Sequence, residues 1–413
     1  MTHSFPASFK NLAWANLAAQ AAEQVSLTAV PILAVLMLGA GAGEIGFLAT
    51  VQTLPFLLMA LPLGVLADRS SRKRLMVVSE ALRVLSLVGL CFLAFTGQAS
   101  LGMLAVLGFI GATGTVGFTV AAPALVPALV PRESFAAANG RLELARSVAF
   151  AAGPALAGAL VSWAGASAAF VLASMLSAAA LLLLIKVPEP PRASTAPRSV
   201  KQELAEGAGF VWASDLLRPM VTCGVVWNLG WFVLQAAYVP YAVKTLGLSA
   251  NAVGLTLASY GTGMVLGALL APRLLAWVTF GVAILVGPMV SVLASFTMVA
   301  SLYWPSAWVA GLSFFLFGVG PIIWTITSTT LRQTIVPSAL LGRVGAMFVA
   351  VNSGARPLGA ALGGVVGAAW GEPACLILSA ALFTLQAVLI LLSKVRELQR
   401  LPPSANAAPV VAG

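Results

Sequence analysis

Long apolar runs, separated by short segments that hold charged residues or Pro and Gly, follow one another along this chain. Each run is close to the roughly 20 residues that a helix needs to cross a hydrocarbon layer about 30 Å thick. Runs such as 178–185 do not alternate polar and apolar residues, so they predict helices and not the strands of a barrel. About twelve spans are predicted, at 11–38, 45–67, 75–96, 101–129, 142–163, 167–186, 219–243, 251–271, 277–301, 307–331, 343–368 and 373–393.

A polar, Pro-rich segment at 187–218 interrupts this pattern and is typical of a linker. It separates a bundle at 1–186 from a second bundle at 219–393, and a tail follows at 394–413. A repeated element links the two bundles: Leu129-Val-Pro with Gly153-Pro in the first, and Ile335-Val-Pro with Arg356-Pro in the second. The sequence therefore predicts an all-α membrane protein of two pseudo-symmetric six-helix bundles. The alternative is chance recurrence in a chain rich in Ala, Gly and Pro.

Composition agrees with lipid as the main solvent, because 60% of the residues are hydrophobic and only 8% are charged. The net charge of +10 lies in short segments between the runs, which argues against a nucleic-acid partner. With the N-terminus cytoplasmic, only Lys244 falls in an outer loop, so both ends are predicted to be cytoplasmic. We expect a multi-pass protein of the bacterial inner membrane, its first run being a permanent helix and not a cleaved signal.

Enzyme chemistry finds little support in the sequence. The one histidine is His3, and the cysteines Cys91, Cys223 and Cys375 lie far apart in apolar runs, so no metal site is expected. No G-x-x-x-x-G-K-[ST] phosphate loop is present. We therefore expect no cofactor, and an ion gradient such as the proton gradient, or the solute's own gradient, as the source of energy.

The loop between the second and third spans reads Gly64-Val-Leu-Ala-Asp68-Arg69-Ser-Ser-Arg72-Lys73-Arg74. It resembles the signature loop of the major facilitator superfamily, G-x-L-A-D-R-x-G-R-K-x, with Ser71 in place of a glycine. Gly64 permits close helix contact, Asp68 can pair at a helix end, and the cations suit an anionic membrane surface. The resemblance implies a conformational role, as a latch between the halves in the outward-open state. A plain cytoplasmic loop would explain the cations alone.

The fifth span contains Gly153-Pro154-Ala-Leu-Ala-Gly158, which is similar to the antiporter motif of exporting members of that superfamily. Ala149 and Ala159 replace two of its glycines, and simple helix packing is the alternative. Segments around Pro131-Arg-Glu-Ser and Leu341-Gly-Arg look like the bacterial branch that contains macrolide efflux proteins and the enterobactin exporter. The fourth span lacks the family's arginine, so a proton relay through that residue cannot be transferred.

Glu23 is the clearest candidate for proton coupling, because a charge inside the membrane usually faces a cavity or a partner. It shares a stripe of the first helix with Asn16, Gln20 and Gln24. A carboxyl in an apolar cavity can bind and release a proton near neutral pH, as a proton-driven exporter requires. Permanent ionisation against an arginine, or a structural hydrogen bond, is the alternative.

Other polar residues are candidates for the substrate cavity. Arg356, one turn after Asn352, can pair with a carboxylate, bind an anionic substrate or serve helix packing. Two i, i+3 pairs, Glu80 with Arg83 and Glu143 with Arg146, are expected to be local ion pairs near the gate. One face of the seventh span and, by the resemblance, part of the tenth complete the set: Asn228, Trp231, Gln235, Tyr238, Trp324, Thr325 and Thr327.

These residues predict a secondary active transporter that exports a small amphipathic compound, such as a drug or siderophore, by proton antiport with alternating access. Aromatic walls with scattered amides suit a bulky amphipathic ligand. The expected partners are this small-molecule substrate and the lipid bilayer, with the protein as a monomer. A nutrient importer or symporter of the same fold remains an alternative, as does a receptor or scaffold without transport.

Overall fold

The computed structural model describes residues 5–131, 134–189 and 200–403, and every regular element in these ranges is a helix. The first part of the chain forms α1 (Ala7–Leu38), α2 (Ala42–Leu58), α3 (Ala60–Arg69), α4 (Arg72–Thr96), α5 (Leu101–Leu129), α6 (Phe135–Ala164) and α7 (Ala166–Ile185). The second part forms α8 (Val200–Ala213), α9 (Leu217–Pro240), a π-helical turn (Tyr241–Thr245), α10 (Ala250–Trp277), α11 (Phe280–Ala300), α12 (Ala307–Ile335), α13 (Ser338–Leu391) and a 3₁₀ turn (Lys394–Glu397).

Hydroxyl side chains begin many of these helices, because the first backbone N–H groups of a helix need an acceptor. Ser71 accepts a hydrogen bond from Arg74 N at 2.9 Å, and Ser249 accepts one from Ala252 N at 3.3 Å. At the other end, α1 stops at Gly39, whose φ of 66° is the left-handed conformation that favours glycine. Short loops with such caps let each apolar run form one helix.

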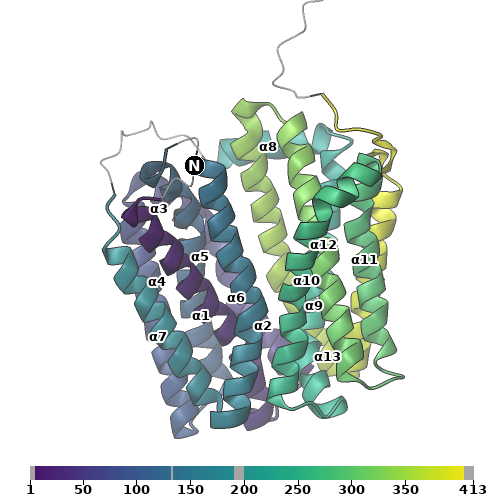
Figure 1. The fold of residues 1–413 in the computed structure, drawn as a ribbon. Coiled ribbons are helices and arrows are strands. Elements are labelled where there is room, and N and C mark those ends of the chain that lie inside the picture. The colour runs from purple at the N-terminus through teal and green to yellow at the C-terminus, as the bar shows by residue number, and fades with distance from the viewer. Residues whose placement is uncertain (1–4, 132–133, 190–199, 404–413) are drawn as a thin grey trace, which may run out of the picture.

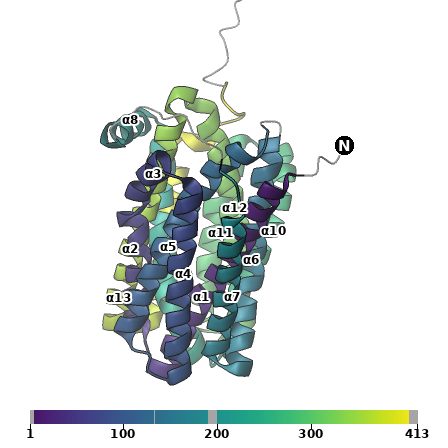
Figure 2. The same cartoon turned by 90° about the vertical axis from the view of Figure 1, so that its left-hand side faces the viewer.

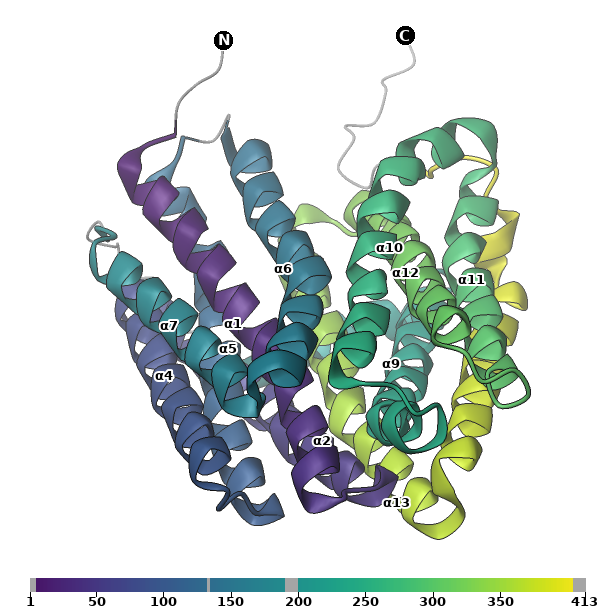
Figure 3. The ribbon, with the colours of Figure 1, turned by 60° about the horizontal axis from the view of Figure 1, so that its bottom comes forward.

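The helices pack as two bundles that lie side by side (Figure 1), with one bundle in front of the other after a quarter turn (Figure 2). In the first half, helices α1–α7, α1 packs against α6 and α7, and α4 packs against α5 and α7. In the second half, helices α9–α13, α12 packs against α10 and α11, and α9 packs against α13. The halves meet where α6 lies beside α10 and α2 beside α13 (Figure 3).

Ten described helices are long and apolar enough to cross a membrane, and counting the bent pair α2–α3 as one span gives eleven. Helix α13 combines the two last predicted spans, and it has one break, at Gly371, where φ is 79° and ψ is 178°. The repeated Val-Pro elements occupy equivalent positions, because α5 ends at Leu129 and α12 ends at Ile335, each with an extended valine as its C-cap.

The predicted linker 187–218 is only partly irregular, because α8 lies within it. Figure 2 shows α8 at one end of the bundles, lying across it. Val211 of α8 is fully buried, and Glu206 forms an ion pair with Arg343 of α13. The segment therefore attaches to the second half of the molecule.

Large apolar side chains cover the outside of the bundles. Trp163, Trp277 and Trp308 are each more than 80% exposed, at 87%, 84% and 89%. An outer surface of this kind suits lipid and not water. Trp304, at 70%, is also exposed, and tryptophan side chains are favoured at membrane–water interfaces.

Candidate functional site

Glycine residues bring α6 and α10 into backbone contact. A Cβ atom at Gly158 would lie 2.8 Å from the Cα of Gly254, and a Cβ atom at Gly254 would lie equally close to the Cα of Gly158. Since real Cβ atoms do not approach so closely, only glycine fits at either position. The predicted antiporter-like motif therefore lies at the contact between the halves. Its Gly153 instead faces α1, where a Cβ atom would lie 2.5 Å from that of Gln24.

The contact between α2 and α13 is built in the same way. A Cβ atom at Gly46 would lie 2.5 Å from the backbone N of Gly364. Beyond the start of α2, Lys244 of the second half donates a hydrogen bond of 2.8 Å to the backbone oxygen of Gly39. We call these two contacts, α6–α10 and α2–α13, the seam. They reach the end of the bundles opposite the start of α1 (Figure 1).

Charged groups from both halves surround Glu23 of α1. The Glu23 carboxyl lies in the electrostatic field of Arg83 (α4), Arg356 (α13), Arg146 (α6) and Glu80 (α4). Arg356 therefore brings charge from the second half to a carboxyl of the first half. Its guanidinium lies over the ring of Phe56 at 5.0 Å, and its Nε is buried without a hydrogen-bond partner among the described residues.

Arg83 forms a buried polar network that joins four helices. Its Nη1 lies 3.1 Å from Glu80 Oε1 and donates to the backbone oxygen of Ala19 at 2.7 Å. Its Nη2 donates to Thr115 Oγ1 at 3.1 Å, and Ser177 Oγ donates to the second oxygen of Glu80 at 2.6 Å. The predicted ion pair is thus present, but it lies inside the bundle, where the side chains of Arg83 and Glu80 are 5% and 0% exposed.

This network was underestimated from the sequence, although a signal was available. Glu80 and Arg83 lie inside a predicted span, with apolar residues on both sides, and an intramembrane charge calls for a partner. The second pair, Glu143 with Arg146, forms the predicted local ion pair at the surface. The side chain of Glu143 is 55% exposed and that of Arg146 is 35% exposed. The same spacing therefore gives a buried pair and an open pair.

An aromatic cluster fills the middle of the second half. Trp231 stacks on Trp227 at 5.4 Å between ring centroids, and it contacts Tyr260 at 5.0 Å and Phe317 at 5.4 Å. Phe150 of the first half reaches Tyr260 at 6.0 Å. The cluster thus extends from the interior of the second half to the seam between α6 and α10.

The polar candidates on α1 face α6. Asn16 is buried and donates to the backbone oxygen of Leu142 at 3.1 Å, and Gln24 is buried against Gly153. Gln20 and Glu23 are only half-buried. The predicted stripe is therefore divided, with two members in packing contacts and two that keep accessible surface.

The candidates on α9 and α13 come together in part. Asn228 donates to Asn352 Oδ1 at 3.4 Å and to its own helix at Gly224 O at 2.9 Å. Tyr238 instead is fully buried, packs on Phe314 and shares a hydrogen bond with Thr256. Gln235 is half-buried. Asn228 and Asn352 thus form one pair between α9 and α13, and Tyr238 lies in the core of the second half.

The candidates on α12 are not brought to one place. Thr325 is exposed and Thr327 is fully buried, and the hydroxyl of each donates to a backbone oxygen of its own helix. The Cβ of Trp324 packs so closely on α11 that a Cβ at Gly287 would lie 2.5 Å from it. No common ligand site follows from these three contacts.

In the predicted latch loop, the start of α4 binds a carboxylate of the first half. Glu189, just after α7, accepts hydrogen bonds from the backbone N–H groups of Arg72 at 2.9 Å and Lys73 at 3.2 Å, and from Ser71. A carboxylate at a helix N-terminus is stabilised by the helix dipole. Ser71, which replaces the family's glycine, begins α4 as its N-cap. Lys73 also donates to the backbone oxygen of Ile185.

Further residues of that loop differ in their exposure. Gly64 is half-buried, and Arg74 is exposed. The side chains of Asp68 and Arg69 lie outside the described residues.

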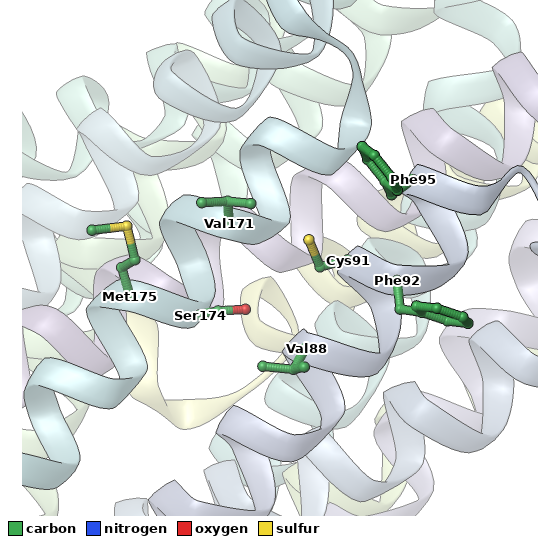
Figure 4. A pocket seen from close by; sticks show the side chains of 7 residues that line it. All are labelled: Val88, Cys91, Phe92, Phe95, Val171, Ser174 and Met175. Atoms are coloured by element: carbon green, nitrogen blue, oxygen red, sulfur yellow. The ribbon is translucent and has the colours of Figure 1, made fainter.

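A shallow cavity of about 380 Å³ lies between α4 and α7, on the side away from the second half. Figure 4 shows its lining, which is apolar apart from Ser174: Val88, Cys91, Phe92, Phe95, Val171, Ser174 and Met175. Such walls suit hydrocarbon. Among the residues that the structure describes, no group of His, Cys, Asp and Glu side chains could hold a metal ion.

Two bundles of long apolar helices that meet at a glycine seam, with charged side chains beside it, define a polytopic membrane protein. The chain belongs to the Major Facilitator Superfamily, whose sequence model matches residues 12–360. It is a transport protein and not an enzyme, and a multi-pass protein of the bacterial inner membrane.

Its relatives include exporters. The chain is 30% identical over 356 residues to the enterobactin exporter EntS of Citrobacter koseri, with 84% of this chain and 83% of the relative covered. It is 30% identical over 355 residues to the enterobactin exporter EntS of Salmonella typhimurium, with 83% and 82% covered. The resemblance to the exporter branch is thus confirmed.

Solved structures share the fold at low identity. The nucleoside transporter NupG is 13% identical with a TM-score of 0.73 over 93% of this chain and 98% of that one. A bacterial homologue of the iron transporter ferroportin, in the inward-facing state, is 15% identical with a TM-score of 0.72 over 92% and 98%. These structures support the fold alone.

Proposed function

We propose that this protein is a secondary active transporter that exports a small amphipathic compound, such as a drug or siderophore, by proton antiport. One observation carries the proposal: Glu23 of the first half lies in the field of Arg356 of the second half, beside the seam. The electrostatic interaction between charges on two bundles weakens when the bundles separate. The names of the exporter relatives favour the outward direction.

Twelve spans are part of the proposal. Helix α13 has 54 residues, about 80 Å of helix, which is far more than one span needs. Its break at Gly371 leaves segments 338–370 and 372–391, each long enough to cross. An even number of spans places both termini on one side, and the positive-inside rule makes that side cytoplasmic. The units are then the bundles 1–186 and 219–393, the linker 187–218 and the tail 394–413.

The seam favours a state that is closed toward the outside. Gly46, Gly158 and Lys244 contact the other half at the end away from the proposed cytoplasmic surface. Alternating access then consists of parting this seam while the opposite ends of the bundles approach. The loop from Gly64 to Arg74 would act in the other, outward-open state, in which its cations meet the second half.

Glu23 couples the proton to the ligand by competition. A ligand that donates a hydrogen bond to the ionised carboxylate occupies the same oxygens that a proton takes. Binding of one therefore excludes the other, and each favours a different state of the transporter. The aromatic cluster around Trp231 and Tyr260 supplies the apolar wall for the remainder of an amphipathic ligand.

Proteoliposomes with an imposed pH gradient test this function, with enterobactin and a fluorescent amphipathic dye as trial substrates. The wild-type protein should move substrate in proportion to the gradient. Glu23→Gln should lose the dependence on pH and keep substrate exchange in the absence of a gradient. Glu397→Gln, which removes an exposed carboxylate after the last helix, is the control and should behave as wild type.

Flux without any dependence on the pH gradient, together with a fully active Glu23→Gln variant, would refute proton coupling. Net uptake into intact cells that stops when the gradient is dissipated would instead favour an importer or symporter.

A further inference from the structure

A second cavity, of about 550 Å³, lies at the corner where α8, α9 and the end of α13 meet. Its lining combines an aromatic residue, aliphatic residues and charged groups: Trp212, Asp215, Arg218, Pro219, Thr222, Leu389, Leu392, Ser393 and Lys394. None of these residues belongs to the Glu23 site. The corner lies where α9 begins at Leu217 and α13 ends at Leu391, which is the level of a membrane surface.

One carboxylate serves two cations at this corner. Asp215 Oδ2 accepts a hydrogen bond of 2.6 Å from Lys394 Nζ, and Asp215 Oδ1 lies 3.8 Å from Arg218 Nη2. The second distance is at the limit for an ion pair, and the guanidinium keeps donors that this contact does not use. All three side chains are at least half exposed. The corner therefore carries a net positive charge and accessible donors.

An apolar track leads from the cations into the membrane. Leu392 is 78% exposed and Leu385, two turns earlier on the same helix, is 46% exposed, with Leu389 between them in the cavity wall. Trp212 is 63% exposed at the opposite rim. Tryptophan is favoured at the headgroup level of a bilayer. Cations at the surface, with aliphatic side chains below them, match a phosphate group attached to acyl chains.

We propose that this corner binds an anionic phospholipid, with its phosphate between Arg218 and Lys394 and an acyl chain along Leu389 and Leu385. The site is separate from the transport pathway and does not depend on the proposed export. Bound lipid would stabilise the contact of α8 with the start of α9 and the end of α13 at the membrane surface.

Native mass spectrometry of the full chain in detergent tests the site, with phosphatidylglycerol as the probe and phosphatidylcholine as the zwitterionic reference. The wild-type protein should bind one phosphatidylglycerol molecule more tightly than any phosphatidylcholine. The double variant Arg218→Ala/Lys394→Ala should weaken that binding by about tenfold to thirtyfold, since each surface cation contributes about a factor of five. Lys10→Ala/Arg273→Ala removes one exposed lysine and one exposed arginine elsewhere and should leave that binding unchanged.

A variant with the opposite sign separates lipid binding from mere damage. Asp215→Asn removes the carboxylate that competes for both cations, so phosphatidylglycerol should bind more tightly than to wild type. Equal losses in the two double variants, or weaker binding by Asp215→Asn, would overturn the proposal. So would displacement of the lipid by inorganic phosphate at equal concentration, because the site would then be one for a free anion.

Discussion

The two halves share one architecture, but their interiors are filled with different chemistry. The first half has a buried charge network, Glu80 with Arg83, which Thr115 and Ser177 complete. The interior of the second half has aromatic rings packed around Trp231 and Phe317, which meet edge to face. Its intramembrane cation, Arg356, lies beside the seam and acts on Glu23 of the other half. The difference lies in what holds each interior together: an ion pair with hydrogen bonds in the first half, and contacts between aromatic rings in the second.

The largest expected effect comes from breaking the charge network. Arg83→Met leaves Glu80 buried without its cation, which should lower the free energy of unfolding by about 3–5 kcal/mol. Unfolding in mixed micelles with rising SDS measures the change. Arg146→Met, which breaks an open pair of the same spacing, should change stability far less.

Removing both charges distinguishes a charge penalty from lost packing. Glu80→Leu/Arg83→Met should recover much of the stability that Arg83→Met loses, because no unpaired charge then remains in the bundle. A double variant that is less stable than either single variant would show that packing, and not charge, dominates in the first half.

An intermediate effect is expected from the aromatic cluster. Phe317→Leu removes two ring contacts, with Trp231 at 5.4 Å and Phe383 at 4.8 Å, and should cost about 1–3 kcal/mol. No second substitution should restore this loss, in contrast to the charge network. The same SDS titration measures it, and Phe296→Leu, at an exposed position of α11, is the control. If Phe317→Leu leaves the stability unchanged, the aromatic cluster does not stabilise the second half as the charge network stabilises the first.

The smallest effect is expected at the rim of the second half. The hydrogen bond from Lys394 holds the pKa of Asp215 below its ordinary value, and the same bond raises the pKa of Lys394. The contribution of Asp215 to the free energy of unfolding is complete above the ordinary pKa of an aspartate. It disappears as the pH falls through the lowered pKa of Asp215. The contribution of Lys394 to the free energy of unfolding is complete below the ordinary pKa of a lysine. It disappears as the pH rises through the raised pKa of Lys394.

The ion pair between Asp215 and Lys394 should therefore be intact between about pH 4 and pH 10. Thermal unfolding of wild type and Asp215→Asn, compared across this range, should show a small constant difference that vanishes in acid below it. A difference that persists in strong acid would assign the effect to packing and not to charge.

Most helices could be predicted from hydropathy, because a bilayer forces each apolar run to satisfy its own backbone hydrogen bonds. The predicted span 101–129 coincides with α5. Helix α8 was missed because the prolines before it dominated the reading of 187–218, although Val200, Leu204, Ala208 and Val211 follow helical spacing.

Which face of a helix meets which neighbour could not be predicted from one sequence. Tyr238 and Thr327 looked like cavity residues, but the structure buries both within the second half. The contact of Arg83 with α5 was equally invisible. It places a guanidinium against the fourth span, where the resemblance led us to expect an arginine and the sequence has none.

The glycine seam has a consequence for the speed of any opening motion. Between Gly158 and Gly254 the two backbones touch directly, so neither residue has a side chain that must change its rotamer when the helices part. Elsewhere along the seam side chains meet across it, as Phe150 of α6 meets Tyr260 of α10. The hydrogen bond of Lys244 to the Gly39 carbonyl must also break, and water can replace it because this bond is exposed. The speed of opening therefore depends on these side-chain contacts and not on the glycines.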